Sequence, residues 1–367
     1  MEQAPRCAVV GSGLAALAAY ATLRRGGLEP EQILVFGTHD DPTAVWRERA
    51  TSIRQRRMRS ESDGHLAAAS WPGLAVYEWA RTGSWRPVAA SLVDRYHPTV
   101  DEFLAHAEWL RGRIGWDRSF VHRRVEQIRA VDGGFELDGE GPVAHVLVAT
   151  GHPGLARPAE YPNAVHAYEP HAYASRVAIV GAGMAAATEW LNALEAGAEV
   201  VSVRRRPPLR RPLSVPRPLF SKRGLSAYHR SPPARRAALL RDLSAPSYPP
   251  GRDWDAPLEA AMSTSQFRVS DVSQTRNWAE QVICATGFLR GFSHDRVLSD
   301  LVDHHGLETY EGWIVLAPDS TVPALTDDRR TLSLAGVAAQ WAFPAADTIS
   351  GAKFAARAFL RHACRTR

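Results

Sequence analysis

The stretch RVAIVGAGMAAATEWLNALEAGAEVVSVRRR, residues 176–206, contains the pattern that decides the fold. A short apolar, β-branched run precedes Gly181 and Gly183, and residues 184–194 have helical composition, which predicts a strand, a tight turn and a helix. Gly181 permits the turn, Gly183 lets the backbone approach a pyrophosphate, and Ala186 allows close packing of the helix on the strand. The stretch therefore indicates half of a βαβ unit, with a dinucleotide at the N-terminus of its helix.

A second copy of this pattern lies at the start of the chain. Residues 7–21, CAVVGSGLAALAAYA, place Gly11, Gly13 and Ala16 in the same three roles. One such motif alone is weak evidence, but two in one chain support each other. Two dinucleotide sites together imply a flavin, FAD, and a nicotinamide cofactor.

A second repeated feature is an apolar strand that ends in Ala-Thr-Gly. Residues 143–151 read VAHVLVATG and residues 279–287 read AEQVICATG, each well downstream of its own glycine turn. Small residues are needed where the backbone and a cofactor come close. The repeat predicts cofactor contacts at Thr150, Gly151, Thr286 and Gly287.

Length and composition limit the classes of protein to which the chain can belong. The chain has 367 residues, 45% of them hydrophobic, which is enough for two domains with substantial cores. No apolar run approaches the roughly 18 residues of a membrane span, and no apolar targeting segment precedes the first strand, so we expect a cytoplasmic protein. Cys7, Cys284 and Cys364 are far apart and form neither a disulfide framework nor a C-x-x-C redox pair.

The formal net charge of +5 is concentrated in one proline-rich segment. Residues 204–241 hold twelve Lys and Arg and no Asp or Glu, so the rest of the chain has an excess of seven negative charges. We expect mostly irregular structure there, with one short helix at residues 234–243. A nucleic-acid face is one explanation of the charge. We favour another, because Arg204 and Arg205 follow a predicted strand at the position where an NADP-specific fold binds the 2′-phosphate.

The residues after the second predicted strand carry a family resemblance. Trp46 and Arg47, followed by an R-S-x-x-x-x-x-L pattern at residues 59–66, resemble the NADPH-using, flavin-dependent monooxygenases. That group, the class B flavoprotein monooxygenases, contains Baeyer-Villiger enzymes, dimethylaniline-type oxidases and amine N-hydroxylases. The resemblance implies that Trp46 and Arg47 cover the flavin and that the loop of Arg59 lies beside the isoalloxazine. Ala44 and Val45 replace the two glycines of the family's G-G-x-W segment, and a basic surface loop with one buried Trp is the alternative.

The resemblance covers nearly the whole chain and implies further contacts. It places Val125 against the FAD adenine and Gly336, with the helix after it, at the flavin. His166 belongs to a partial match to the family's F-x-G-x-x-x-H signature, and we expect it to orient the linker between the domains. One departure is Gly37, which stands where an acidic residue usually binds the ribose.

These patterns predict an α/β fold with two Rossmann-like dinucleotide-binding domains. The FAD domain is expected at residues 1–170 and 288–367, and the NADPH domain at residues 171–287. The function implied is an NADPH-dependent FAD monooxygenase that uses O2 to oxygenate a small organic substrate. The rivals are a flavin reductase that passes electrons to a protein or quinone, and a cofactor-binding protein without turnover. No metal site, catalytic acid or base, substrate or oligomeric state is predicted.

Overall fold

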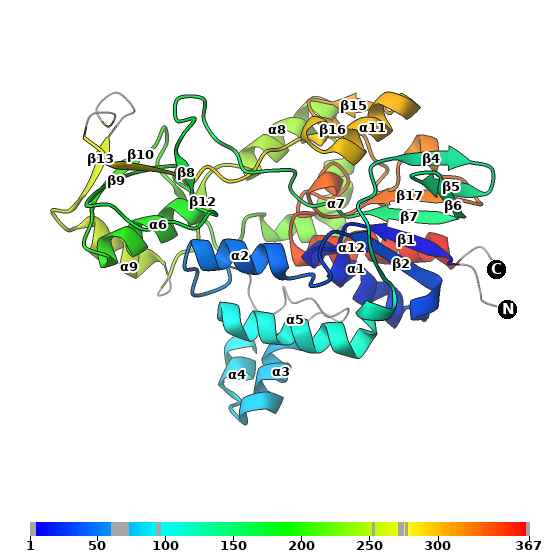
Figure 1. The fold of residues 1–367 in the computed structure, drawn as a ribbon, viewed down its shortest axis with the longest axis horizontal. Helices are drawn as coiled ribbons and strands as arrows, with labels where there is room; N and C mark the ends of the chain where they lie inside the picture. The colour runs from blue at the N-terminus through cyan, green and yellow to red at the C-terminus, as the bar shows by residue number, and fades with distance from the viewer. Residues whose placement is uncertain are drawn as a thin grey trace.

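The computed structural model describes residues 5–59, 73–92, 97–251, 254–270, 275 and 278–364. Its ribbon shows two lobes, each built on a sheet (Figure 1). The first sheet has the strand order β17-β7-β1-β2-β3 and the second β13-β10-β9-β14-β8, and all these pairings are parallel. The predicted α/β class with two Rossmann-like units is therefore confirmed.

The first unit contains the N-terminal glycine turn. Its strands are β1 (Cys7–Val10), β2 (Ile33–Gly37), β3 (Phe120–His122), β7 (His145–Val148) and β17 (Thr331–Leu334). Helices α1 (Leu14–Arg25), α5 (Val100–Ile114) and α12 (Ile349–Ala363) pack on one face of this sheet. The antiparallel strands β4 (Ile128–Val131), β5 (Gly134–Leu137) and β6 (Glu140–Val143), together with α11 (Arg296–His305), cover the other.

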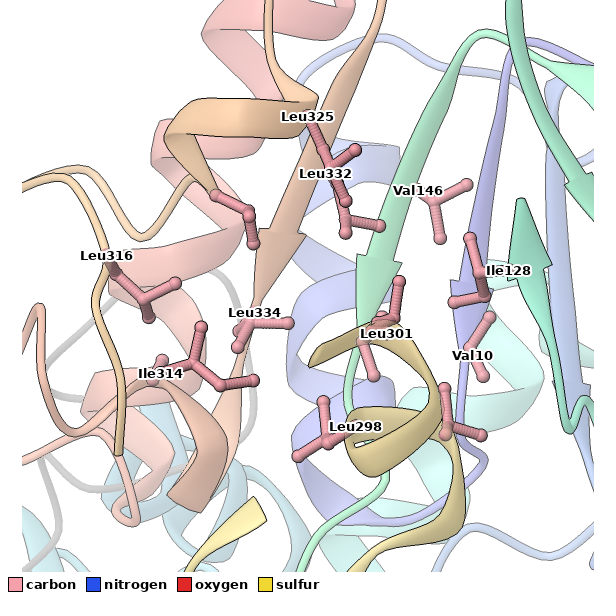
Figure 2. Packing of buried hydrophobic residues seen from close by; sticks show 14 of the residues in the cluster. Val10, Ile128, Val146, Leu298, Leu301, Ile314, Leu316, Leu325, Leu332 and Leu334 are labelled. Carbon is pink, nitrogen blue, oxygen red and sulfur yellow. The ribbon is translucent and has the colours of Figure 1, made fainter. Parts of the chain in front are cut away.

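The period of two along β1 explains this layering. Cys7 and Val9 point into the helical layer, and Ala8 and Val10 point into the opposite one. Figure 2 shows Val10 in that second layer beside side chains of α11, among them Leu298. Burial of each aliphatic side chain of this size contributes about 1.5 to 3 kcal/mol, so both faces of the strand stabilise the sheet.

The second unit repeats the arrangement. Its strands are β8 (Val165–His166), β9 (Arg176–Val180), β10 (Glu199–Val203), β13 (Phe267–Ser270) and β14 (Gln281–Cys284). Val177 and Ile179 pack against α6 (Met184–Glu195) and α9 (Asp255–Met262), whereas Ala178 and Val180 face the opposite side. Strand β8 joins this sheet although it lies before residue 170, the expected domain boundary.

Two connecting segments run between the units. Each follows an Ala-Thr-Gly strand, and the two pair antiparallel through the Ala156 N–H to the Gly287 carbonyl (2.9 Å) and the Leu289 N–H to the Gly154 carbonyl (2.9 Å). The Nε2 of His166 lies 3.1 Å from the same Gly287 carbonyl. Because the Tyr168 N–H donates to Nδ1 of this ring, Nε2 carries the proton and donates to Gly287. His166 thus holds the linker, as its partial motif predicts.

The basic proline-rich segment departs from its prediction. It contains β11 (Leu209–Arg210), α7 (Lys222–His229) and α8 (Pro233–Leu243), and β12 (Ser247–Tyr248) follows it. The helix at residues 234–243 is confirmed, but the expectation of mostly irregular structure is wrong. Ser221 caps α7 by accepting the Gly224 N–H, and the prolines stand outside the helices or in a first turn, as Pro218 does in the 3-10 helix Arg217–Phe220 and Pro233 in α8.

The basic proline-rich segment lies in sequence between strands of the second unit, but it packs on the first unit. The Tyr228 hydroxyl donates to the Trp341 carbonyl (3.2 Å), and His229 Nε2 lies 2.6 Å from the Ala342 carbonyl. Val215 and Ala237 join the core of the first unit. The basic segment therefore bridges the two units.

Two local sequence patterns have different outcomes. The spacing of Thr99 and Glu102 predicts a capping box before α5, and it is confirmed, because Thr99 Oγ1 accepts the Glu102 N–H (3.1 Å) and the Glu102 carboxylate accepts the Thr99 N–H (2.6 Å). The alternation at residues 121–130 predicts one strand, but the structure has two separate strands there, because β3 ends at His122 and β4 begins at Ile128. Residues 123–126, between them, line a cavity.

The remaining helices near the first unit are α2 (Ala44–Ser52), α3 (Gly73–Thr82) and α4 (Arg86–Leu92). Helix α2 lies between the lobes, and α3 and α4 project beyond α5 (Figure 1). Within the described ranges, no helix has the length and apolar character that crossing a membrane requires.

Candidate functional site

A cavity of about 880 Å³ lies at the carboxyl ends of the first sheet. The ends of its five strands border it: Gly11, Thr38, Arg123 and Ala149 directly follow β1, β2, β3 and β7, and Gly336 lies two residues after the end of β17. Ligands of open parallel sheets bind at this edge, where helix N-termini and strand ends converge. The glycine turn at which the sequence predicts a cofactor thus borders this cavity.

The first glycine turn forms one wall. Gly11 has φ +118°, and a Cβ there would lie 2.3 Å from the Ala149 carbonyl oxygen, so only glycine fits between β1 and β7. Gly13 precedes α1, and a Cβ there would meet no atom within 4 Å, because it would point into open space. Ala16 is fully buried and brings α1 close to the sheet. The turn leaves room for a ligand at the start of α1.

The missing acid at Gly37 has a steric explanation. A Cβ at Gly37 would lie 2.1 Å from Ser12 Oγ, so the Ser12 side chain fills the space of an acidic residue. Asp41 lines the cavity, but its carboxylate already accepts the Thr43 hydroxyl (2.7 Å) and pairs with Arg47 (3.1 Å). Burial alone would raise the pKa of Asp41, but these hydrogen bonds and the Arg47 charge outweigh it and lower the pKa.

The residues expected to cover the flavin differ in whether they line the cavity. Trp46 lines the cavity and packs edge-to-face on Phe103, with ring centroids 5.0 Å apart. Arg47 is not among the lining residues, because its guanidinium turns to Asp41 and Thr43. Arg59 lines the cavity but bonds to the second unit, and residues 60–66 of the same motif lie outside the described residues.

The other residues expected at the flavin also reach the cavity. Val125, Thr150, Gly151 and Gly336 line it. Within the described part of the chain, the buried Thr150 Oγ1 has no hydrogen-bond partner. A buried hydroxyl without a partner is unfavourable, and a ligand oxygen or nitrogen would satisfy it.

The second glycine turn has the same backbone. Gly181 has φ +135°, and a Cβ there would lie 2.4 Å from the Ala285 carbonyl oxygen. Gly183 precedes α6, and Ala186 is fully buried against the sheet. The Thr286 hydroxyl donates to the Ala156 carbonyl in the linker. None of these residues lines the cavity of the first unit.

Two residues connect the second unit to that cavity. Met184, the first residue of α6, lines it, and so does Tyr168 at the end of the linker. Tyr168 stacks on Phe288 (5.1 Å), and Phe288 stacks on His152 (4.3 Å), whose ring also lines the cavity. Burial lowers the pKa of His152 to about 4, so this ring is neutral near pH 7. The cavity therefore borders both units.

The predicted 2′-phosphate residues follow β10. Arg204 is half-buried, with its guanidinium over the Trp190 ring at 5.6 Å, and Arg205 is exposed. Burial lowers the pKa of Arg204, which still leaves it charged at neutral pH. The position of these two arginines suits an anion that binds beyond the end of β10.

Asp347 is a residue that the sequence patterns missed. The pair Asp347-Thr348 is typical in sequence of a helix N-cap, a role that Thr348 performs by accepting the Gly351 N–H. Asp347 lines the cavity and stays accessible to solvent, although many protein atoms surround its carboxyl group. Burial raises its pKa, although the charge of Arg290 opposes this effect. A carboxylate beside a helix cap in a glycine-poor segment carries no sequence signal of a binding role.

Comparison with known proteins supports the fold. No protein-family profile and no curated protein sequence matches the chain. The ornithine N-hydroxylase of Kutzneria sp. 744, solved with reduced FAD, NADP⁺ and L-ornithine, matches with a TM-score of 0.72 and 16% identity over 99% of both chains. An ornithine hydroxylase from Pseudomonas aeruginosa matches with a TM-score of 0.70 and 15% identity, over 98% of this chain and 99% of that one.

The fold also occurs with other chemistry. The bacillithiol disulfide reductase of Bacillus cereus matches with a TM-score of 0.60 and 16% identity, over 99% of this chain and 100% of that one. At identities this low, the matches show a common fold alone. The reaction has to be argued from the site.

Proposed function

We propose that this chain is an NADPH-dependent FAD monooxygenase of a small organic substrate. The observation that carries the proposal is the shared cavity: it begins at the first glycine turn and reaches Met184 at the start of the second dinucleotide helix. Hydride transfer requires the two cofactors to meet, and a cavity bordered by both units provides the place. FAD, when bound, supplies hydride acceptance and the reaction with oxygen.

The residues of the first unit fit FAD. Gly11 and Gly13 leave space for a pyrophosphate at the N-terminus of α1, whose N–H groups favour phosphate. Thr150 offers a hydroxyl without a partner among the described residues, and Gly336, after the neighbouring strand β17, lies close to Ala15 of α1. Trp46 and Val125 provide apolar lining. We assign residues 1–170 and 288–367 to this FAD domain, except for β8, which pairs in the other sheet.

The second unit, residues 171–287, fits NADPH. Gly181, Gly183 and Ala186 reproduce the turn, and Thr286 with Gly287 closes its Ala-Thr-Gly strand. Arg204 and Arg205 supply positive charge for the 2′-phosphate. A cytoplasmic location, where NADPH is available, is part of this proposal.

The main rival is a reductase without oxygenation. The Bacillus cereus structure demonstrates that the fold accommodates such a protein. In this chain Cys7, Cys284 and Cys364 are free, and the sequence contains no C-x-x-C pair to receive electrons from a flavin. The two hydroxylases match with higher TM-scores, and this favours oxygenation.

The substrate class to screen first is amines. Both hydroxylases act on ornithine. Asp347 presents a carboxyl group to the cavity in this chain, and a carboxylate binds an ammonium group through charge-assisted hydrogen bonds. Its raised pKa would fall when a cation binds beside it.

The deciding experiment follows oxygen and peroxide together. Protein loaded with FAD is reduced by NADPH without oxygen and then mixed with oxygenated buffer in a rapid-mixing instrument. A monooxygenase should release hydrogen peroxide later than it consumes oxygen while NADP⁺ is bound, because the closed site excludes water. With a suitable amine, peroxide should be replaced by a product that contains one oxygen atom from O2. Immediate, stoichiometric peroxide with and without NADP⁺ would favour the reductase.

A further inference from the structure

Arg59 belongs to a segment of the first unit that crosses to the second. Residues 53–59, here called the crossing segment, follow α2. Ile53 is buried in the core of the second unit, and its carbonyl accepts the Asn192 amide at 2.7 Å. At the other end, Arg59 Nη1 donates to the Ser247 carbonyl (3.1 Å), and Nη2 donates to Ser247 Oγ (3.0 Å) and the Arg211 carbonyl (3.1 Å). The Arg59 guanidinium is therefore held in place by the second unit.

This guanidinium lacks a negative partner in the described part of the chain. Its hydrogen bonds go to two carbonyls and a hydroxyl, and no carboxylate lies within ion-pair distance. Burial and the positive charge of Arg211 lower the pKa of Arg59 to about 10, although the charge of Asp347 opposes both effects. A largely desolvated cation beside a second cation costs free energy that a bound anion would offset.

The start of α6 faces the same place. A Cβ on Gly183 would lie 3.9 Å from Pro246, the residue before Ser247, so the second glycine turn is next to the anchor of Arg59. Met184 and Arg59 both line the cavity. Helix α6 has 12 residues, and its first N–H groups carry partial positive charge. Arg59, with the positive charge of Arg211 near it, and the N-terminus of α6 thus lie around the same part of the cavity.

We propose that Arg59 and Arg211 bind the pyrophosphate of the nicotinamide dinucleotide at the start of α6. This inference rests on the proposed function and changes the role of Arg59: the residue comes from the FAD domain but binds the other cofactor. A dinucleotide held in this way contacts both units. Its departure would leave two neighbouring guanidinium groups without an anion, so binding also stabilises the arrangement of the crossing segment on the second unit.

The test measures binding rather than turnover. Four variants are prepared: Arg59→Gln, Arg211→Gln, Ser247→Ala and, as the matched control, Arg56→Gln. Arg56 lies in the same crossing segment and also bridges the units through Glu195 (2.5 Å), but it does not line the cavity. FAD content is read from absorbance, and the Kd values of NADP⁺ and NAD⁺ are determined by calorimetry. Thermal unfolding reports on the fold.

The pyrophosphate is common to both nicotinamide cofactors, and this sets the expected pattern. Arg59→Gln should weaken NADP⁺ and NAD⁺ alike, by roughly 10- to 150-fold, and leave FAD content unchanged. Arg211 is half-buried and does not line the cavity, so Arg211→Gln should weaken both less than Arg59→Gln does, by about 1.5- to 5-fold, and more at low salt than at high salt. Ser247→Ala loosens the anchor without removing a charge and should cost less than Arg59→Gln. Arg56→Gln should leave both Kd values unchanged.

Three outcomes would overturn the inference. Loss of FAD from Arg59→Gln with normal NADP⁺ binding would show that Arg59 binds the flavin rather than the nicotinamide cofactor. Equal losses in Arg59→Gln and Ser247→Ala, with none in Arg211→Gln, would mean that Arg59 acts only as a tether. Unchanged Kd values in Arg59→Gln would remove it from the site. If the unaltered protein binds FAD but neither nicotinamide cofactor, the proposed function fails together with the inference.

Discussion

In the first unit Gly11 leaves β1 with φ +118°, and in the second Gly181 leaves β9 with φ +135°. The next glycines, Gly13 and Gly183, both cap their helices with φ near −85° and ψ near −169°. The backbones of the two turns are thus nearly equal, but their surroundings differ. Around the first turn most of the cavity lining comes from its own unit, whereas near the second turn Arg59 of the other unit bonds to Ser247. A glycine motif therefore specifies the local turn, whereas the residues that surround the turn are determined by the tertiary structure.

The largest effect is expected where the two turns are most alike. Gly11→Ala and Gly181→Ala each place a Cβ within 2.4 Å of a carbonyl oxygen, at a φ that alanine rarely adopts. Each should lower the free energy of unfolding by about 3 kcal/mol or more. Chemical denaturation measures the loss.

Gly27→Ala is the control for these two variants. Gly27 has φ +93°, but a Cβ there meets no atom within 4 Å. Its substitution should cost only about 1 to 2 kcal/mol. If Gly11→Ala is no worse than Gly27→Ala, close contact with Ala149 does not constrain the first turn.

The second prediction separates the turns by ligand. At Gly13 and Gly183 the φ values suit any residue, and a Cβ has open space or ordinary contact. Gly13→Val should fold but abolish FAD retention, because its side chain takes the space of the pyrophosphate. Gly183→Val should retain FAD and lose NADP⁺. Absorbance and calorimetry measure both. Full flavin occupancy in Gly13→Val would mean that FAD binds elsewhere.

The third prediction uses the different ends of the second strands. Gly37 ends β2 against Ser12, whereas Arg204 and Arg205 follow β10. Arg204→Ala or Arg205→Ala should weaken NADPH binding about 10- to 150-fold, for one charge-assisted hydrogen bond, and leave NADH nearly unchanged. Steady-state KM and equilibrium Kd values check this. Equal losses with both cofactors would show that these arginines do not read the 2′-phosphate.

The sequence allowed the two strand-turn-helix units to be predicted because their rules are local. Glycine spacing, β-branched runs and the Thr99–Glu102 capping box act over a few residues. The fold class, α6 and the capping box followed from such signals. So did the cavity-lining positions of Gly11 and Gly13.

What could not be predicted depends on contacts distant in sequence. Ser12 excludes a side chain at Gly37, 25 positions away, and no pattern links them. Arg47 and Arg59 both belong to motifs that resemble the family's flavin-contacting segments. In the structure, however, Arg47 pairs with Asp41, and Arg59 bonds to Ser247 of the second unit. Asp347 reaches the cavity through the placement of α12, which packing determines.

The smallest expected effect distinguishes the two Ala-Thr-Gly strands. Thr286 donates its hydroxyl to the Ala156 carbonyl, whereas the buried Thr150 hydroxyl has no partner among the described residues. Thr286→Val should therefore destabilise the protein by about 1 kcal/mol whether or not FAD is present. Thr150→Val should leave the stability of the FAD-free protein unchanged or slightly higher, because it removes an unsatisfied buried group. With FAD bound the order changes: if the Thr150 hydroxyl contacts the cofactor, its loss should weaken FAD binding by up to about 10-fold. Thermal unfolding with and without added FAD measures all four states. An equal loss of stability from Thr150→Val in the absence of FAD would show that this hydroxyl serves the protein rather than the ligand.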